Sequence, residues 1–189
     1  MLSKILKPLR ILFTPSKIHL FFCYLLATVG ALSQTVPTTT GSKVSQADAQ
    51  AALDFHNKAR KDVGSPPLEW SKDLAKYAQA WADHLAKENC QMKHRPHEGE
   101  WKQIHGENIF WGSANYTARD ASEDWYSEIK DYKHGALTGA NWYATGHYTQ
   151  MVWKNTAKVG IAQAVCKDGA IIIVGNYDPP GNYMGEKAY

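Results

Sequence analysis

Residues 146–153 read Gly-His-Tyr-Thr-Gln-Met-Val-Trp, and residues 175–183 read Gly-Asn-Tyr-Asp-Pro-Pro-Gly-Asn-Tyr. Each segment mixes glycine, aromatic and polar residues in an order that the periodicity of helices and strands does not produce. The two segments therefore say more about the fold and about a candidate site than the average composition does.

The composition is that of an ordinary globular domain with an extension. The 189 residues are 44% hydrophobic and 21% charged, which suits one domain. The formal charge of +3 comes from the first 33 residues, which hold four basic side chains and no acidic one. Removing these four from the 21 basic residues leaves 17 against 18 acidic residues. A basic surface for nucleic acid is therefore not expected.

Residues 1–33 have the pattern of a secretory signal peptide. A basic start precedes an apolar run over residues 20–32, and small residues at Ala31 and Ser33 predict cleavage before Gln34. The apolar run is shorter than the ~20 residues that span a bilayer. The long basic start leaves an uncleaved signal anchor as the alternative, and both interpretations put the domain outside the cytoplasm. We therefore expect a secreted, extracellular protein with no stable membrane span once it is processed.

Export also bears on the cysteines and on one asparagine. Cys23 lies in the leader, which leaves Cys90 and Cys166 for the exported domain. Two such cysteines most simply form one disulfide, worth on the order of 4 kcal/mol for so long a loop, and two buried free thiols are the alternative. Asn115 begins an Asn-Tyr-Thr sequon in a polar stretch, so we expect it to be glycosylated.

Residues 34–44 are polar, Thr-rich and interrupted by Pro and Gly, so they are predicted to form a short flexible linker before a domain at residues 45–189. Three segments of this domain show apolar residues at helical spacing, each after a Ser or Thr that can cap a helix. These helices are expected after Ser45, after Ser71 as far as about Asn89, and after Thr117.

The last third of the chain is richer in β-branched and aromatic residues. Strands are predicted at residues 147–153, 159–166 and 170–177, and Lys-Asp-Gly at residues 167–169 supplies a hairpin turn between the last two. Helices followed by strands with short turns predict an α+β fold, with an antiparallel sheet packed against helices.

Four polar residues are candidates for a site. They are His94, Glu107, Glu128 and His147, and none of them belongs to a local His-Glu-x-x-His or Cys-x-x-Cys zinc motif. From spacing alone, each is either a ligand or catalyst, or a hydrogen-bonded polar residue at the edge of a cleft.

The two segments quoted first resemble the signature segments of the CAP superfamily, which comprises cysteine-rich secretory proteins, antigen 5 and plant pathogenesis-related class-one proteins. The resemblance covers roughly residues 45–189 and implies an α–β–α sandwich with a central antiparallel sheet (the CAP or SCP fold). Plant members usually have six cysteines, and the two that remain here are partners in that pattern, which implies a Cys90–Cys166 bridge. Ile161 and Gly175 stand where other members have cysteine, so the chain departs from a strictly plant-like pattern.

The resemblance also implies that the four candidates meet in one central cleft. Family members carry a histidine shortly after the first cysteine, a glutamate in Gly-Glu-Asn, a glutamate in Trp-x-x-Glu and a histidine in Gly-His-Tyr-Thr-Gln. The matching residues here are His94, Glu107, Glu128 and His147. His97 and His105 lie in the same loop as His94, so the sequence leaves open which of the three matches the family's first histidine.

Two imidazoles and two carboxylates have two chemical uses. They can bind Zn²⁺ or another divalent cation, with His94 and His147 as ligands, or they can hydrogen-bond to one another with no cofactor. A hydrolase would also need a nucleophile or a metal-bound water, together with an oxyanion-stabilising group. No Gly-x-Ser-x-Gly motif is present, so catalysis, which would be metal-dependent proteolysis, is the less favoured expectation.

The resemblance therefore implies a secreted protein that acts by binding a sterol, another lipid or an extracellular protein, in defence or signalling. An apolar cluster at Trp101, Ile104 and residues 109–111 forms either a lipid groove or part of the core. A metal-dependent peptidase is one alternative. The other is a precursor of a C-terminal signalling peptide that starts at Pro179, although that tail can simply pack on the core. A monomer or weak homodimer is expected.

Overall fold

The structure, a computed structural model, describes residues 34–189. The signal peptide or signal anchor predicted for residues 1–33, Cys23 included, lies outside the described residues. None of the helices within residues 34–189 has both the length and the apolar character required to cross a membrane.

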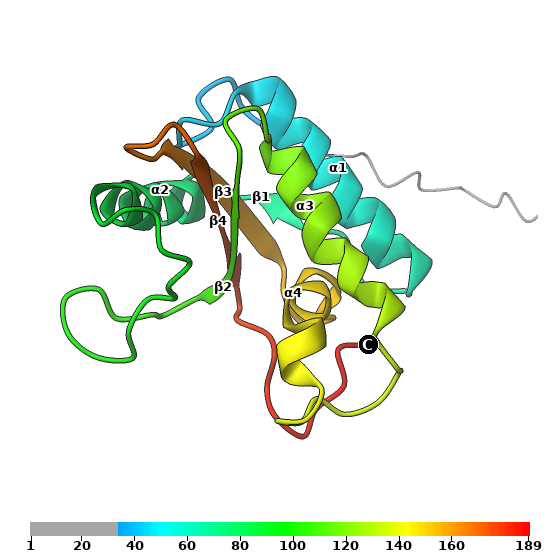
Figure 1. The fold of residues 1–189 in the computed structure, drawn as a ribbon. Helices are drawn as coiled ribbons and strands as arrows, with labels where there is room; N and C mark the ends of the chain where they lie inside the picture. The colour runs from blue at the N-terminus through cyan, green and yellow to red at the C-terminus, as the bar shows by residue number, and fades with distance from the viewer. Residues whose placement is uncertain (1–33) are drawn as a thin grey trace, which may run out of the picture. The chain divides into compact units, whose positions relative to one another are not determined.

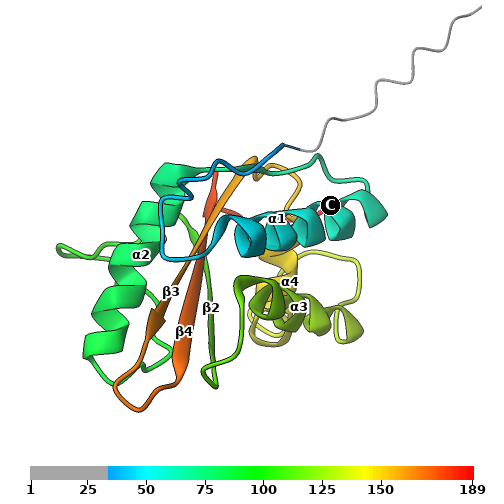
Figure 2. The ribbon, with the colours of Figure 1, turned by 90° about the horizontal axis from the view of Figure 1, so that it is seen from above.

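The described chain forms three layers, with a four-stranded sheet between two layers of helices, which confirms the predicted α–β–α sandwich (Figure 1). Helix α2 (Lys72–Lys87) covers one face of the sheet. The other face is covered by three helices, as Figure 2 shows from above. These helices are α1 (Gln46–Asp62), α3 (Ala118–Ser127), which continues into a short 3₁₀ turn η1 (Glu128–Lys130), and α4 (Trp142–Val152).

The sheet is mixed, with strand order β1-β3-β4-β2. Strands β3 (Lys158–Val165) and β4 (Ile171–Asp178) form the predicted antiparallel hairpin, and β2 (Gly106–Gly112), which was not predicted, pairs antiparallel with β4. Strand β1 (Glu69–Trp70) pairs parallel to β3, so the prediction of a wholly antiparallel sheet is wrong at this edge. A strand of two residues is too short to show any alternation of apolar and polar residues.

Residues 147–153 do not form the predicted strand. They belong to α4 and its C-cap, and five consecutive residues of this helix, from Tyr148 to Val152, are buried. The second half of this helix is buried on every side and has no polar face, so its sequence lacks the 3.6-residue period. Strand β2 was missed for the same reason, because six of its seven residues are buried and apolar and polar residues do not alternate along it.

The three helices predicted from their caps are confirmed. The side chains of Ser45 and Ser71 each accept a backbone N–H of the first turn, and Thr117 forms a reciprocal capping box with Asp120. Asp48 of α1 also accepts from the backbone N–H groups of residues 118 and 119, at 2.8 and 3.0 Å. A residue in the first turn of α1 therefore caps α3 and fixes the two helices against each other.

Residues 34–44 are not a flexible linker. Val36, Thr40 and Val44 are buried, and the Ser42 hydroxyl donates to the Ile161 carbonyl of β3 at 2.8 Å. The segment is part of the fold because its few apolar side chains all reach the core, which its polar composition does not reveal.

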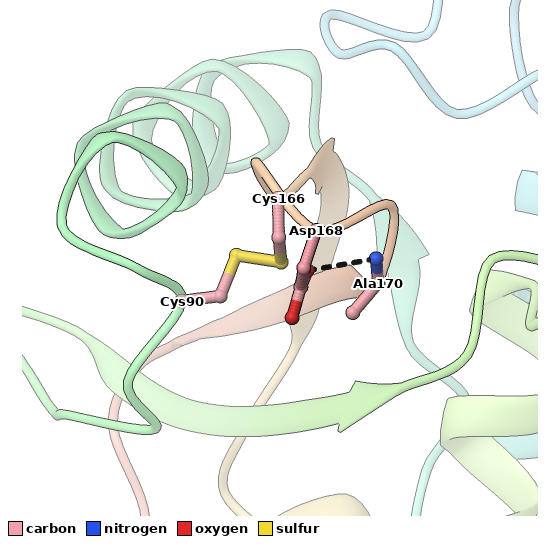
Figure 3. Close-up of a disulfide and its surroundings, with 4 residues drawn as sticks. All are labelled: Cys90, Cys166, Asp168 and Ala170. Carbon is pink, nitrogen blue, oxygen red and sulfur yellow. Dashed lines mark hydrogen bonds between the residues drawn. A yellow bond between two sulfur atoms is a disulfide. The ribbon is translucent and has the colours of Figure 1, made fainter.

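The structure contains the Cys90–Cys166 disulfide, drawn in Figure 3, with Cα atoms 5.7 Å apart. It joins the segment after α2 to the end of β3, next to the predicted hairpin turn. Within that turn the Asp168 carboxylate accepts the Ala170 backbone N–H at 3.0 Å. The bridge closes a span of 76 residues and so restricts the unfolded chain strongly.

The guanidinium of Arg60 is buried where the helices of one layer meet. It donates to the carbonyls of Pro66, Met151, Trp153 and Thr156 over 2.6–3.0 Å. Burial lowers the pKa of Arg60 to about 10, which leaves it charged at neutral pH. One side chain of α1 thus satisfies the carbonyls at and beyond the end of α4, which have no partner within the helix.

His56, also on α1, is buried and neutral. Its Nδ1 lies 2.9 Å from the Ala52 carbonyl, which can only accept, so Nδ1 carries the proton and Nε2 accepts from the Tyr177 hydroxyl at 2.9 Å. Burial first, and the charge of Arg60 in addition, lower the pKa of His56 from 6.5 to about 4.

Acid should therefore destabilise the fold through His56. The unfolded histidine binds a proton below about pH 6.5, whereas the folded one does so only near pH 4, so protons favour the unfolded state between these values. We expect about 3 kcal/mol of unfolding free energy to be fully present above pH 6.5 and lost by pH 4. Urea unfolding at pH 7, 5 and 4 measures this, with the unfolding free energy of each protein expressed relative to its own value at pH 7. The unfolding free energy should fall less steeply with decreasing pH in His56→Gln than in the wild type. An equally steep fall in both proteins would contradict the assignment.

Candidate functional site

One cavity of about 520 Å³ brings the four predicted residues together. It lies between the loop before β2, the start of β2, the end of α3, helix α4 and the segment after β4. Its lining includes His94, Glu107, Glu128 and His147. The residues come from four separate segments, which explains why no local motif connects them in the sequence.

His94 and Glu107 form one pair in this cavity. His94 Nδ1 lies 2.9 Å from Glu107 Oε1, and that oxygen also accepts the Arg95 backbone N–H at 3.1 Å. The Glu107 side chain is wholly buried, while that of His94 is half-exposed. Of the other two histidines in the loop, His97 lines the cavity and His105 Nδ1 lies 3.2 Å from Asp178 Oδ1. The partner of Glu107 is therefore His94.

His147 and Glu128 form the second pair. His147 Nδ1 lies 2.8 Å from Glu128 Oε1, and Glu128 Oε2 accepts the backbone N–H groups of His147 and Tyr148 at 2.8 and 3.0 Å. Glu128 is the C-cap of α3, so its carboxylate joins the end of that helix to the interior of α4. Three hydrogen bonds to one carboxylate fix both the backbone and the imidazole of His147.

The two pairs determine which imidazole nitrogen is available to a ligand. An ionised carboxylate can only accept, so Nδ1 of each histidine must donate its proton to the glutamate. In the neutral imidazole, Nε2 then carries the lone pair, and within residues 34–189 no hydrogen bond of either Nε2 is present. A carboxylate on Nδ1 is the usual support for a histidine that binds a metal through Nε2.

The protein by itself supplies few ligands for a metal. Within the described residues, no three His, Cys, Asp or Glu side chains are grouped so that they could hold an ion together. A cation at His94 and His147 would therefore complete its coordination with water or with atoms of a bound molecule, since Zn²⁺ usually has four ligands.

Arg95 holds the loop that carries His94. Its guanidinium carbon lies 3.8 Å from the ring centre of Tyr77 and 5.1 and 5.3 Å from those of Trp81 and Trp101. The guanidinium donates to the Tyr77 carbonyl at 2.7 Å and lies 3.7 Å from the Glu107 carboxylate. Burial lowers the pKa of Arg95. Nothing in the sequence distinguishes this arginine, because all its partners are distant along the chain or on another element.

A buried amide connects the cavity to the core. Asn108 Nδ2 donates to the His147 carbonyl at 3.1 Å and to the Tyr177 hydroxyl at 3.2 Å, and that hydroxyl donates to His56. Asn108 and Tyr177 belong to Gly-Glu-Asn and Gly-Asn-Tyr, the segments that carry the family resemblance. Their structural role was not inferred from the sequence, although their place in those motifs was a signal.

The segment after β4 forms one wall of the cavity. Gly181 N–H donates to Gln150 Oε1 at 3.1 Å, and Asn182 donates to the Gly146 carbonyl at 2.7 Å and accepts from Thr149 at 2.7 Å. Further along the tail, Ala188 is buried. The C-terminal tail is thus packed on the domain, as the simpler of the two sequence interpretations expected.

Part of the cavity lining is apolar and exposed. Trp142, Tyr143 and Met184 belong to it, with exposed fractions of 41%, 88% and 56%. None of the residues that line the cavity is Ser, Thr or Cys.

The apolar cluster predicted around the Gly-Glu-Asn segment does not form one groove. Ile109 packs in the core under α2, whereas Phe110 packs in the core on the other face of the sheet. Trp101 packs against Trp81, with ring centres 5.6 Å apart, while Ile104 and Trp111 are exposed. Alternate residues of a strand point to opposite faces, which separates the members of this cluster.

Comparisons with known proteins agree with this architecture. A model of the cysteine-rich secretory protein family, CAP, matches residues 53–177. Pathogenesis-related protein 1C of Nicotiana tabacum is 43% identical over 145 residues, which cover 76% of this chain and 82% of that protein. Pathogenesis-related protein 1 of Arabidopsis thaliana is 37% identical over 169 residues, covering 89% and 95% respectively.

The solved structures give the same result. A crystal structure of NaASP2 with Zn²⁺ superposes with a TM-score of 0.67 and 27% sequence identity, covering 77% of this chain and 86% of that one. The family model matches well over half of the chain, and both plant relatives match along most of their length. The chain therefore belongs to the cysteine-rich secretory protein (CAP) family, which confirms the resemblance noted in its sequence.

Proposed function

We propose that this CAP protein acts outside the cell by binding, in a defence or signalling role, and that its central cleft holds the ligand. The observation that carries the proposal is the pairing of each cleft histidine with a glutamate through Nδ1, which leaves both Nε2 atoms for a ligand. The pathogenesis-related relatives support the defence role.

A divalent cation, Zn²⁺ first, fits the donors of the cleft. Neutral imidazole is a good ligand for Zn²⁺, and the glutamates would orient the rings through their hydrogen bonds to Nδ1. The presence of Zn²⁺ in the related NaASP2 structure supports the same choice of metal. His94 and His147 would be the protein ligands, and the bound cation would supply a positive charge that attracts a polar or anionic group of the ligand.

The mixed lining of the cleft suggests an amphipathic ligand, such as a sterol or another lipid with a polar head. Trp142, Tyr143 and Met184 would contact its apolar part, and the histidines and Arg95 its polar part. A metal-dependent peptidase would use a water on the cation as its nucleophile, and it would also need an oxyanion-stabilising group. If the chain were the precursor of a C-terminal peptide, the tail that packs on the cavity wall would first have to detach from it.

Secretion after cleavage before Gln34 belongs to this proposal. The Gln34 side chain accepts the Trp70 backbone N–H, so the expected mature chain begins with a residue that is bound to the domain. An exported monomer or weak homodimer is part of the same proposal.

The metal proposal is tested by calorimetric titration of the secreted protein with Zn²⁺. We expect saturable binding in the wild type, loss of it in His94→Ala/His147→Ala, and no change in His134→Ala, whose histidine bonds the Tyr189 carbonyl instead. Glu128→Gln should weaken binding about 10- to 100-fold because the ring of His147 loses its carboxylate support. Equal binding by the wild type and the double variant would contradict the assignment.

The ligand proposal is tested by titrating a fluorescent sterol into the same proteins. Trp142→Ala/Tyr143→Ala should weaken sterol binding at least 10-fold, because two large apolar contacts are lost, while Zn²⁺ binding stays unchanged. The matched control is Tyr116→Ala, which removes an exposed aromatic residue outside the cleft. Sterol affinity that is unaffected by the cleft variant would exclude the cleft as the sterol site.

A further inference from the structure

We propose that the chain binds an extended acidic segment of a partner protein, which adds a strand at the open edge of β3 in a groove beside helix α2. The groove shares no lining residue with the central cleft. The inference is therefore independent of the proposed function.

Strand β3 has one edge that the sheet covers only in part. The short strand β1 pairs with residues 158 and 159 alone. The Ser71 N–H, just after β1, donates to the Val159 carbonyl at 2.8 Å, so the odd-numbered residues of β3 present their backbone groups to this edge, since alternate residues of a strand bond to opposite sides. Beyond the reach of β1, the edge consists of backbone groups of Ile161, Gln163 and Val165.

Side chains cap the first part of this edge. The Ser42 hydroxyl donates to the Ile161 carbonyl at 2.8 Å, and the Gln79 amide of α2 donates to the Gln163 carbonyl at 2.9 Å. The N–H of Gln163 and both backbone groups of Val165 face away from β4, and no other partner of these three groups is present within residues 34–189. Two donors and one acceptor are thus left for an added strand.

A groove lies along these backbone groups. Its volume is about 580 Å³, which is in the range of binding sites. One wall is the edge of β3 at residues 163–165, and the other is formed by residues 83–87 of α2, which runs beside β3 in Figure 2. The Val165 side chain is 68% exposed. This end of the edge is therefore open to solvent, whereas natural proteins usually cover or charge such an edge.

The charges around the groove favour an acidic occupant. Lys43, Lys87 and Lys167 line it together with Asp83, whose Oδ1 lies 2.6 Å from Lys43 Nζ. Three lysines and one aspartate give the groove a net charge of +2, whereas residues 34–189 together hold 17 basic and 18 acidic side chains. The positive charge is thus local to this groove and attracts carboxylates. Two copies of the chain paired at this edge would instead bring like charges together.

The two faces of β3 specify the pattern of the bound segment. Ala162 and Ala164 pack in the core under α2, so the side chains of Gln163 and Val165 point to the opposite face. An added strand would place every second side chain on the α2 side, next to Lys87, and the others on the side of the exposed Val165. We therefore expect acidic residues that alternate with β-branched apolar ones.

The test uses the full secreted chain and the hexapeptide acetyl-Val-Glu-Val-Glu-Val-Thr-amide as the probe. In ¹H–¹⁵N correlation spectra, the amide signals of Gln163 and Val165 should shift saturably, and both N–H groups should exchange more slowly. The peptide with lysine in place of glutamate should bind at least about 10-fold more weakly, because its charges repel those of the groove. The acidic peptide with all three valines N-methylated should not bind, because it cannot donate to the edge.

Variants of the protein test the same contacts from the other side. Val165→Pro removes a donor that faces away from β4, a position at which a sheet tolerates proline, and should weaken binding at least about 10-fold. The matched control Val165→Thr keeps the N–H and should bind like the wild type. Lys167→Glu should weaken binding about 3- to 10-fold, whereas Lys158→Glu, an equal charge change at the covered end of β3, should not.

Any of three results would overturn the inference: no binding of the acidic peptide, equal binding of its N-methylated form, or equal binding of the lysine peptide. A sulfated oligosaccharide that binds equally well to the wild type and to Val165→Pro, in place of the peptide, would mean that the lysines hold a polyanion and not a strand. Self-association through the same amides would mean that the edge serves a second copy of the chain. Both outcomes contradict the proposal, and none of these results bears on the central cleft.

Discussion

The central cleft depends on two carboxylates that each bind an imidazole and the backbone of another segment. Glu107, on β2, accepts from His94 and from the backbone of the loop before the strand. Glu128, at the end of α3, accepts from the ring of His147 and from two backbone N–H groups inside α4. Buried carboxylates are tolerated only with such partners. The histidines are therefore placed only when four separate segments have come together, and the cleft forms with the fold.

The same cleft is tied to the core on its inner side. The Asn108 amide connects the carbonyl of His147 to Tyr177, and Tyr177 leads to His56 in α1. Arg60, one turn further along α1, binds the carbonyls at the end of α4. Helix α4 thus has its interior bound from α3 and β2, and its end bound from α1. A helix held at so many points positions a ligand-binding histidine more rigidly than a surface loop would.

The sequence predicted the elements whose signals lie within a few residues of each other, and it missed the elements and contacts that depend on residues far apart in the chain. Ser45, Ser71 and Thr117 are caps within a few residues of the groups they bind, so three helices were predicted, and Lys167 to Gly169 defined the hairpin in the same way. The second half of helix α4 and six of the seven residues of strand β2 are buried, so their sequences have no period to recognise. The candidate site residues could be named from the sequence, but only the family resemblance placed them in one cleft. Arg95 had no signal of its own role, and Asn108 had only its place in Gly-Glu-Asn, because their partners lie far away in the chain.

The central claim is that Glu107 and Glu128 fix one tautomer of the two cleft histidines. Long-range ¹H–¹⁵N correlation spectra of the protein with labelled histidine, at neutral pH, measure this directly, and single His→Ala variants assign the signals. We expect both neutral rings to carry the proton on Nδ1, and only their Nε2 signals to shift when Zn²⁺ is added. A proton on Nε2 of either ring, or rapid averaging of the two tautomers, would contradict it.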